Sequence, residues 1–361
     1  MDSAKNKDTY VLIMAGGVGS RFWPKSRTDF PKQFIDILGT GRSLLQMTYD
    51  RFRGICPPEN IFILSNDEYT GLIRQQLTTL PAENIVAEPS RNNTAPCIAY
   101  ASFKIAGLNP DAKIIVAPSD HLILNENKFL QQIEECLAFI GSNDALVTLG
   151  IQPTRPDTGY GYINYADEAG GNLKKVRKFH EKPDLTTAEG FLEEGSYLWN
   201  AGIFIWTAGS ILSALSEFSP EIYEIFEKGL PYYNEESEAD FIKLNYPLTP
   251  NISIDYAVME HAKNVYTLPG NFGWSDLGTW ASLYEVLPKD DCGNTFSGCQ
   301  INLTKTTNCV IQLPNNKSAV VKGLSNYIIV DDGEFLLIYP KSDEQEVKNI
   351  SKCFSKMTES V

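Results

Sequence analysis

The sequence has 361 residues, enough for two packed units of roughly 100 to 200 residues each. It carries 31 lysine and arginine residues against 45 aspartates and glutamates, a formal net charge of −14 at pH 7. This balance excludes a sequence-independent grip on nucleic acid, because such binding needs basic side chains that neutralise phosphates. Residues 1–32 are the exception, with six basic side chains against three acids: Lys5, Lys7, Arg21, Lys25, Arg27 and Lys32 against Asp2, Asp8 and Asp29.

The seven cysteines lie far apart in the sequence, and no two of them form a Cys-x-x-Cys pair. We therefore expect neither a structural zinc site nor a disulfide framework, and a reducing compartment follows. No run of 18 apolar residues occurs, and the polar stretch from Met1 to Asp8 does not resemble an export signal. The sequence predicts a cytoplasmic protein without a membrane partner.

The first 150 residues alternate short apolar runs with helical patterns. The apolar runs lack alternation and are bounded by glycine or proline, which is typical of buried parallel strands; they lie at 10–14, 61–64, 85–87 and 114–117. Apolar side chains at helical spacing predict helices over 44–52, 72–77, 95–106 and 129–140. This alternation predicts an α/β unit whose ligands bind at the carboxyl ends of the strands.

The pattern becomes more mixed after residue 150. It predicts strands over 159–163, 173–180 and 199–206 and helices near 211–215 and 254–261. After Pro288 short β-rich stretches are separated by Asn, Gly and Pro turns, and helical spacing returns only after Asp343. We therefore predict a catalytic domain over 1–288 and a β-rich domain with a terminal helix over 289–361.

A glycine-rich segment, Ala15-Gly-Gly-Val-Gly-Ser20, directly follows the first predicted strand. Glycines at such a place let backbone N–H groups approach an anion, because no Cβ blocks the contact. The segment is not a Walker A loop, and Phe22 occupies the place of the third glycine of a dinucleotide motif, which weakens nicotinamide binding. Four basic side chains accompany the glycines, so a phosphate cradle is favoured over a plain turn; they are Arg21, Lys25, Arg27 and Lys32.

With these residues the sequence resembles the sugar-nucleotide pyrophosphorylases. Its Phe22-Trp-Pro and Pro31-Lys-Gln-Phe strings are similar to those of the mannose-1-phosphate guanylyltransferases. Seven further segments match the family in the same order: Glu88–Pro96, Pro118–His121, Thr158–Ile163, Phe179–Pro183, Trp199–Ile203, Ser253–Ala257 and Gly273–Trp280. The resemblance implies a Rossmann-like, mixed-sheet nucleotidyltransferase fold of the glycosyltransferase-A type, followed by a small left-handed β-helix. About 70 residues follow Pro288, too few for a cupin-type isomerase domain as well, so we expect one activity.

The resemblance implies transfer of GMP from GTP to α-D-mannose 1-phosphate, with Mg²⁺ as cofactor and GDP-mannose as a precursor for polysaccharides. A phosphate monoester has a second pKa near 6, so the nucleophile is already ionised and the reaction needs cations more than a base. The implied catalytic residues are Arg21 and Lys32, and the implied metal ligands are Asp120 and Asp276. The implied nucleotide-binding residues are Ala15, Gly16, Gly17, Gly19, Ser20, Glu88, Asn93 and Thr94, and those for the sugar phosphate are Gly161, Glu181, Lys182 and Asn200.

Several of these residues have a plainer interpretation. An isolated aspartate such as Asp120 can cap a helix, and Lys25 and Arg27 can be solvated surface charges. Glu88 offers an acceptor pair for the N1–H and 2-amino donors of guanine, or it is a surface acid before the next helix. The family often has arginine where this chain has Asn92, with Arg91 one place earlier.

Three alternatives to the guanylyltransferase remain at this stage. The enzyme could use another sugar phosphate or another nucleotide, the chain could be a non-catalytic subunit that senses nucleotide sugars, or the glycine segment could bind nicotinamide. A silent subunit is expected to lose phosphate or metal ligands, yet Arg21, Lys32, Asp120 and Asp276 are all present. We expect a homodimer, although no pattern in the sequence fixes the oligomeric state.

Overall fold

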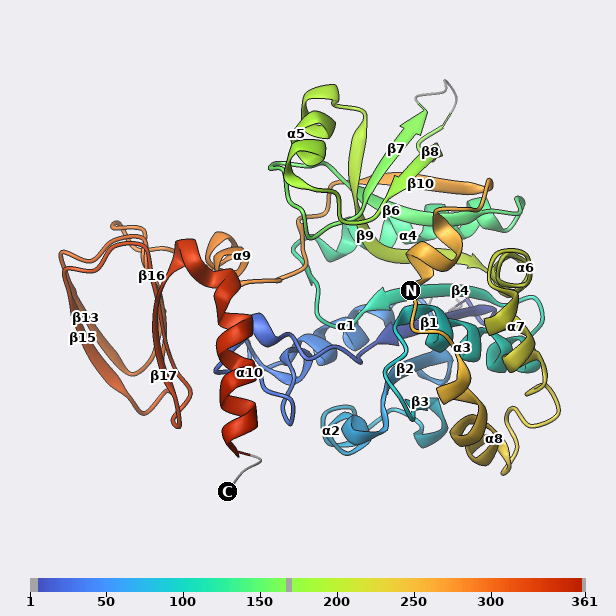
Figure 1. Cartoon of the computed structure of the whole chain (residues 1–361), viewed down its shortest axis with the longest axis horizontal. Coiled ribbons are helices and arrows are strands. Elements are labelled where there is room, and N and C mark those ends of the chain that lie inside the picture. Colours follow the sequence, from blue (N-terminus) through green and yellow to red (C-terminus); the bar gives the residue numbers. More distant parts are fainter. Residues whose placement is uncertain (1–5, 167–170, 359–361) are drawn as a thin grey trace. The chain divides into compact units, whose positions relative to one another are not determined.

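The computed structural model describes residues 6–166 and 171–358. The chain divides into two compact units (Figure 1). Unit 1 contains the described residues up to Gly16, Thr48–Ser119 and those of Ile123–Trp274. Unit 2 contains Gly17–Met47, Asp120–Leu122 and the described residues from Ser275 onward. The domain boundary predicted at residue 288 stays a prediction. The last change from unit 1 to unit 2 along the chain lies between Trp274 and Ser275.

Unit 1 is built around a mixed nine-stranded sheet with the order β3-β2-β1-β4-β9-β6-β10-β8-β7. The strands are β1 (Thr9–Met14), β2 (Ile61–Asn66), β3 (Ile85–Glu88), β4 (Lys113–Pro118), β6 (Leu146–Ile151), β7 (Tyr162–Ala166), β8 (Lys174–His180), β9 (Tyr197–Thr207) and β10 (Val265–Gly270). Strands β1 to β4 pair in parallel, whereas β9 runs antiparallel to both β4 and β6. Val11, Leu12 and Ile13 of β1 are fully buried, so both faces of the sheet are covered at this strand.

Unit 1 also contains helices and 3₁₀ turns, several of which contact the sheet. They are α2 (Thr70–Gln76), α3 (Thr94–Leu108), α4 (Glu126–Ile140), α5 (Leu185–Glu194), α6 (Ala208–Phe218), α7 (Pro220–Glu227), α8 (Glu238–Asn245) and the 3₁₀ turns η3 (Pro58–Asn60), η4 (Asp67–Tyr69), η5 (Ala82–Asn84) and η6 (Tyr246–Leu248). Helix α3 lies against α6 and α7 and shares with them a core that includes Phe103, Ile211 and Phe226. Helix α4 packs on β6, β9 and β10.

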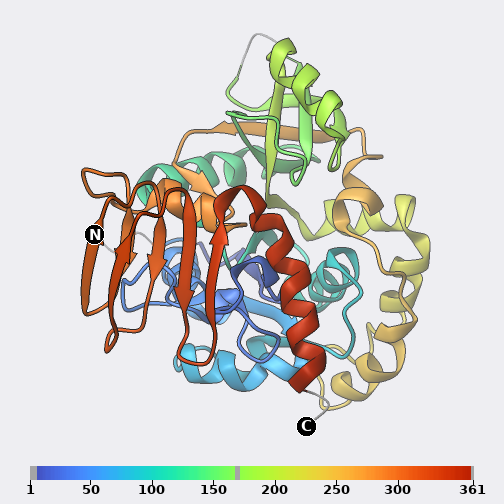
Figure 2. The ribbon, with the colours of Figure 1, turned by 60° about the vertical axis from the view of Figure 1, so that its left-hand side comes forward.

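Unit 2 combines the loop after β1 with the C-terminal strands. Its elements are η1 (Ser20–Phe22), η2 (Lys32–Phe34), α9 (Trp280–Val286), β12 (Thr295–Ser297), β13 (Gln300–Thr304), β14 (Val310–Gln312), β15 (Ser318–Lys322), β16 (Tyr327–Asp331), β17 (Leu336–Pro340), η8 (Lys341–Glu346) and α10 (Val347–Thr358). Phe22, Trp280, Val310 and Val347 belong to one buried cluster, so the loop and the strands share a core. Figure 2 shows α10 alongside the C-terminal strands. Three elements lie where the chain passes between the units: α1 (Leu44–Phe52) and the paired strands β5 (Leu122–Ile123) and β11 (Trp274–Ser275).

The C-terminal strands stack in parallel coils. Strand β14 pairs in parallel with β12 and β16, and β13 pairs in parallel with β15. Partners in register are 18 residues apart between β13 and β15 and between β14 and β16, as for Ile311 and Ile329. Partners of β12 and β14 are 15 residues apart, and β17 pairs with β16 in the antiparallel direction. The β-rich stretches predicted after Pro288 and the helix predicted at the end of the chain are both present, as β12 to β17 and α10.

The first four predicted strands and the helices between them are confirmed, and two later predictions are confirmed only in part. The strand predicted over 159–163 begins only at Tyr162, because the Gly159 N–H donates to Asp157 Oδ1 at 2.8 Å and holds a turn. The helix predicted over 254–261 is a π-helical turn, η7 (Asp255–Met259), in which the Glu260 N–H donates to the Asp255 carbonyl at 3.0 Å.

Candidate functional site

In unit 2, the loop after β1 packs against Lys32. Gly19 has φ of +70°, and a Cβ at this position would lie 2.5 Å from Lys32 Cβ, so only glycine fits. The Lys32 N–H donates to the Val18 carbonyl at 3.2 Å, and the Gln33 side chain donates to the Gly17 carbonyl at 2.9 Å. The predicted loop residues Gly17, Gly19 and Ser20 therefore form one compact turn with the catalytic candidate.

Lys32 brings the two predicted metal ligands together. Its ammonium lies 2.9 Å from Asp120 Oδ2 and donates to the Asp276 carbonyl at 2.7 Å. Lys32 is only 3% exposed, so its charge is taken out of water and depends on these oxygens. Burial raises the pKa of Asp120, but Lys32 and then His121 outweigh it and lower that pKa below its ordinary value. Asp120 is therefore ionised at neutral pH.

The donor set of this cluster fits magnesium. Asp276 Oδ1 accepts the Gly278 N–H at 3.0 Å, which fixes the orientation of the second carboxylate. Two carboxylates beside a lysine supply hard oxygen ligands, and Mg²⁺ commonly takes one or two carboxylates and completes its shell with water and phosphate. The described residues contain no group of three histidine, cysteine or acidic side chains that could form an all-protein cage. Asp120 and Asp276 can hold a metal only together with other ligands.

The other basic residues of the loop contact the C-terminal part of unit 2. Arg27 pairs with both Asp332 and Glu334, and Lys25 Nζ donates to Gln312 Oε1 at 3.1 Å. These contacts give Lys25 and Arg27 a structural role. Arg21 Nε donates to Gln345 Oε1 at 2.9 Å, so this hydrogen-bond partner is a neutral amide.

The predicted nucleoside residues lie in unit 1 at the ends of β1 and β3. The Ala15 N–H donates to the Leu64 carbonyl at 2.7 Å, and Gly16 faces Glu88, with Glu88 Oε1 3.8 Å from the position of a Cβ there. Glu88 is 8% exposed, so it is not a surface acid. Burial raises its pKa to about 7, against the lowering effect of a 2.6 Å hydrogen bond from Tyr246 OH to Oε2. Sequence reasoning missed Tyr246, which lies 158 residues away and outside every matched segment.

Asn93 and Thr94 begin helix α3. The Asn93 side chain accepts the Thr94 N–H at 2.9 Å, and Asn93 has φ of +67°, which an asparagine tolerates better than most residues. Thr94 Oγ1 accepts the Ile254 N–H at 2.9 Å. Both side chains therefore take part in local structure, and their contact with a nucleotide stays a prediction.

The side chain of Arg91 is engaged by neighbouring residues of unit 1. Its guanidinium lies 3.2 Å from Glu68 Oε2 and donates to Tyr69 OH at 2.7 Å. The side chain of Asn92 donates to the Thr249 carbonyl at 2.9 Å. Arg91 and Asn92, where this chain differs from the family, therefore both form contacts within unit 1.

The predicted sugar residues converge elsewhere in unit 1. A Cβ at Gly161 would lie 2.5 Å from Glu181 Oε2 and 3.4 Å from Asn200 Cβ, so glycine lets these groups meet. The Asn200 N–H donates to the Gly161 carbonyl at 2.8 Å, and Lys182 forms an ion pair with Glu181. Asn200 Nδ2 also donates to Asp255 Oδ1 at 2.9 Å. Asp255 lies in a matched segment, but sequence reasoning gave it no role.

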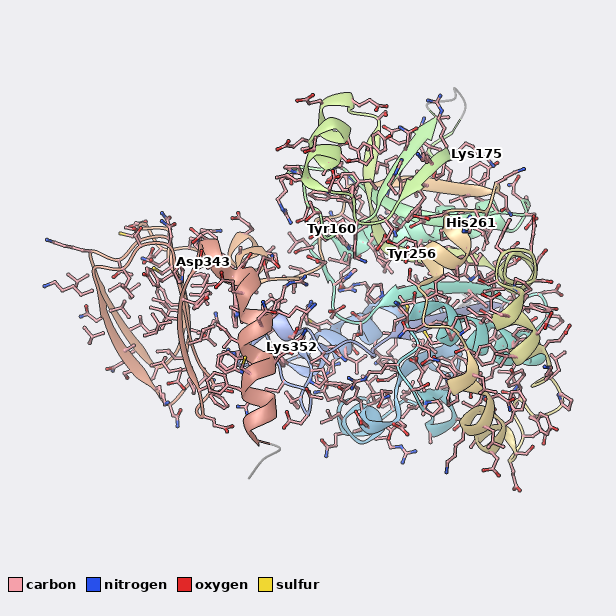
Figure 3. All side chains as sticks on the ribbon, viewed as in Figure 1. Tyr160, Lys175, Tyr256, His261, Asp343 and Lys352 are labelled. Carbon is pink, nitrogen blue, oxygen red and sulfur yellow. The ribbon has the colours of Figure 1, made fainter. Side chains whose placement is uncertain are left out.

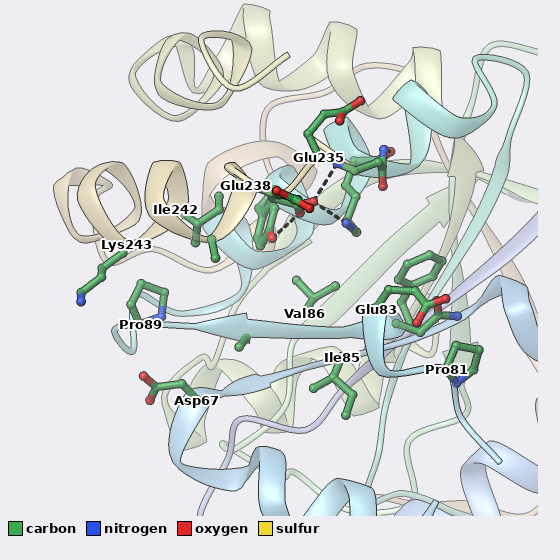
Figure 4. Close-up of a pocket in the computed structure, with 18 of the residues that line it drawn as sticks. Asp67, Pro81, Glu83, Ile85, Val86, Pro89, Glu235, Glu238, Ile242 and Lys243 are labelled. Atoms are coloured by element: carbon green, nitrogen blue, oxygen red, sulfur yellow. Dashed lines mark hydrogen bonds and ion pairs between the residues drawn. The ribbon is translucent and has the colours of Figure 1, made fainter. Parts of the chain in front are cut away.

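A separate cavity of about 1070 Å³ lies in unit 1 beside β3, α3 and α8 (Figure 4). Val86 and Ile242 are among its apolar lining residues. Glu238 on its wall accepts hydrogen bonds from Tyr100 OH and Lys104 Nζ, both at 2.6 Å. The described residues that line it include none of the predicted site residues, so it is not the predicted nucleotide or sugar site.

The sequence profile of the nucleotidyl transferase family matches residues 10–291. The chain belongs to this family. The matched range contains every predicted site residue, from Ala15 to Asp276, and the prediction of a nucleotidyltransferase is confirmed. None of the described helices is both long and apolar enough to cross a membrane.

Curated relatives of this nucleotidyl transferase include two proteins named mannose-1-phosphate guanylyltransferase. The protein from Salmonella muenchen is 37% identical over 94% of this chain and 72% of its own length. The protein from Escherichia coli K12 is 34% identical over 94% of this chain and 72% of its own length. A crystal structure from Thermus thermophilus, described as mannose-1-phosphate geranyltransferase, superposes with a TM-score of 0.87 at 29% identity, covering 96% of this chain and 99% of that one.

Proposed function

We propose that this protein is a mannose-1-phosphate guanylyltransferase, which transfers GMP from GTP to α-D-mannose 1-phosphate and releases pyrophosphate. The observation that carries the proposal is the cluster of Lys32, Asp120 and Asp276, in which one buried ammonium contacts the Asp120 carboxylate and the backbone carbonyl of Asp276. The names of the relatives from Salmonella muenchen and Escherichia coli supply the substrate, mannose 1-phosphate. Relatives named xanthan and alginate biosynthesis proteins support a role for the product in polysaccharide synthesis.

The reaction asks little of the protein in proton transfer. A sugar 1-phosphate oxygen attacks the α-phosphorus of GTP in line with the departing pyrophosphate, and at neutral pH this oxygen already carries its charge. The cost lies in bringing two polyanions together. Positively charged groups that are held in place before the reaction lower this cost without reorganising during it.

Unit 2 supplies these charges in the proposal. Lys32 stabilises charge at the α-phosphate, and Arg21 contacts the triphosphate with its guanidinium. Asp120 and Asp276 would hold Mg²⁺, which when bound neutralises charge on the phosphate oxygens. In the absence of a metal the Lys32 ammonium already balances the negative charge of Asp120.

Unit 1 supplies the recognition of the base in the proposal. Glu88 Oε2 accepts from Tyr246 and keeps a second lone pair, and Oε1 lies on the side of Gly16, so both oxygens can accept from the guanine donors. An ionised carboxylate can accept the N1–H and the 2-amino group together, whereas adenine lacks this donor pair. Uracil and thymine offer one ring N–H that lies between two carbonyl oxygens. The carboxylate repels these oxygens.

The sugar phosphate is recognised by Glu181, Lys182, Asn200 and the Gly161 backbone in the same proposal. Glu181 accepts hydrogen bonds from hydroxyls, and Lys182 meets the phosphate. The test is to incubate the full chain with GTP, mannose 1-phosphate and Mg²⁺ and to identify the product by mass spectrometry. GDP-mannose formed in equal amount to pyrophosphate supports the proposal, and unchanged mannose 1-phosphate contradicts it.

We also infer five further features of the protein. The C-terminal strands form a left-handed β-helix, which the 18-residue coil supports as a three-sided repeat of six-residue segments. Residues 1–288 act as the catalytic domain and 289–361 as its β-rich companion, the metal is Mg²⁺, and the protein is a cytoplasmic homodimer. Light scattering coupled to gel filtration checks the dimer, and a mass of one chain contradicts it.

A further inference from the structure

Asn200 has three of its amide positions occupied by neighbours in unit 1. Its Oδ1 accepts the Thr148 hydroxyl at 2.8 Å and the Gly202 N–H at 3.1 Å. Its Nδ2 donates to Asp255 Oδ1 at 2.9 Å. A side-chain amide has two acceptor sites and two N–H bonds, so a ligand meets only the second N–H.

The surrounding groups determine which way the amide points. The Gly202 N–H is a fixed backbone donor and can face only the carbonyl oxygen of Asn200. Asp255 completes the arrangement by accepting from the nitrogen on the other side. A reversed amide would set N–H against N–H at Gly202 and oxygen against oxygen at Asp255.

Asp255 stands beside Glu181 as well. Burial, and then the charge of Glu181, raise the pKa of Asp255 to about 7. Asp255 opens the π-helical turn η7, an irregularity that often occurs at functional positions. The next residue, Tyr256, is labelled in Figure 3 and is 44% exposed, so the turn reaches the surface of unit 1.

We propose that Asp255 is a positioning residue that determines sugar specificity: it holds Asn200 as a single hydrogen-bond donor next to the Glu181 carboxylate. The ligand is a hexose 1-phosphate with a free hydroxyl at this point. That hydroxyl accepts from Asn200 Nδ2 and donates its own proton to Glu181. This inference rests on the proposed function and gives the segment from Ser253 to Ala257 a role.

The first test compares two substitutions of Asp255. Asp255→Ala leaves the Asn200 nitrogen without its acceptor, and we expect the KM for mannose 1-phosphate to rise roughly tenfold while the KM for GTP is unchanged. Asp255→Asn retains an acceptor oxygen, and we expect it to restore the KM to within about threefold of wild type. Asp290→Ala is the control, because Asp290 accepts the Asn294 N–H at 2.7 Å in a turn outside the proposed site. We expect it to change neither KM.

The second test removes hydroxyls from the ligand. Calorimetry measures the binding of mannose 1-phosphate and its monodeoxy analogues, and needs no turnover. One analogue should bind wild type about tenfold more weakly than the parent and should lose most of this penalty in Asp255→Ala. Equal penalties in both proteins, or an Asp255→Ala variant that binds the parent as well as wild type, overturn the inference alone. A wild-type protein that neither binds nor turns over mannose 1-phosphate overturns the proposed function and the inference with it.

Discussion

Lys32 is a charged side chain that is almost fully buried, and this makes the two aspartates beside it more than surface acids. Its ammonium lies 2.9 Å from Asp120 Oδ2 and donates a hydrogen bond to the backbone carbonyl of Asp276. The carboxylate of Asp276 is oriented by the Gly278 N–H instead. Removing the charge of either carboxylate while keeping its shape therefore separates metal binding from packing.

We predict that Asp120→Asn and Asp276→Asn each lower turnover by at least two decades at saturating magnesium, because each removes one negative ligand from a metal that offsets phosphate charge. The unfolding free energy should change far less in Asp276→Asn than in Asp120→Asn, since only Asp120 pairs with the buried Lys32. Pyrophosphate release and urea denaturation measure the two effects. Retention of more than about half of wild-type turnover by both variants, a barrier change under roughly 0.4 kcal/mol, would make the metal assignment wrong.

Glu88 links nucleotide choice to pH. Its pKa is raised to about 7, and guanine needs the ionised form, so we predict that the KM for GTP falls as pH rises from 6 to 8. Below pH 7 the apparent affinity should weaken by up to about tenfold per pH unit. Glu88→Gln should flatten this profile, weaken GTP by roughly 1 to 3 kcal/mol and increase the relative use of UTP or dTTP. A pH profile and nucleotide preference that are the same in both proteins would remove Glu88 from the base site.

At the scale of elements, the loop after β1 divides its basic residues between two tasks. Lys32 faces the aspartates, whereas Arg27 is paired with Asp332 and Glu334 of the β-rich part of unit 2. The sequence shows four basic residues in one short loop and cannot separate them, because their partners lie up to 324 residues away. Replacing each of the four basic side chains should therefore have a different effect on turnover and stability.

We predict that Lys32→Ala and Arg21→Ala each lower turnover by roughly two to four decades, as expected for a main stabiliser of transition-state charge. Arg27→Ala is the matched control: it should lower the unfolding free energy and leave turnover within about threefold of wild type. Steady-state kinetics at saturating GTP measures the turnover of the three variants. An equal loss at all three positions would indicate a diffuse positive field in place of a positioned clamp.

Strands and loops near the glycine segment followed from local patterns, whereas several site contacts did not. Buried runs such as residues 10–14 and 114–117 carry their own signal, since a parallel strand must be apolar on both faces. Tyr246 carries no such signal, and Asp255 carries only its place in a matched segment, because each acts through a hydrogen bond with a residue far along the chain. The grouping of residues 17–47 with the C-terminal strands is equally non-local, since it rests on a shared core around Phe22 and Trp280.

For the whole molecule, two carboxyl groups of unit 1 with raised pKa values affect stability in a defined pH range. Burial raises the pKa of Glu88 from 4.5, and burial with the charge of Glu181 raises that of Asp255 from 3.8, in each case to about 7. The folded state holds these protons between about pH 4 and 7 where the unfolded chain releases them, so both groups lower stability as pH rises through this window.

We predict that Glu88→Gln removes the contribution of Glu88 to this loss. The unfolding free energy of wild type should fall more between pH 5 and 8 than that of Glu88→Gln, by on the order of 1 to 3 kcal/mol. Urea denaturation of both proteins at the two pH values measures the difference. An identical pH dependence would show that Glu88 titrates normally in the folded protein.

The central claim is that the chain joins GTP to mannose 1-phosphate with the help of a divalent metal. Its most direct test is pyrophosphate release by the full chain over a grid of GTP, ATP, CTP and UTP with mannose, glucose and N-acetylglucosamine 1-phosphates, with Mg²⁺ or with EDTA. We expect the highest kcat/KM for GTP with mannose 1-phosphate, and pyrophosphate release should stop in EDTA. Faster release from another pair, or equal release in EDTA, would contradict it.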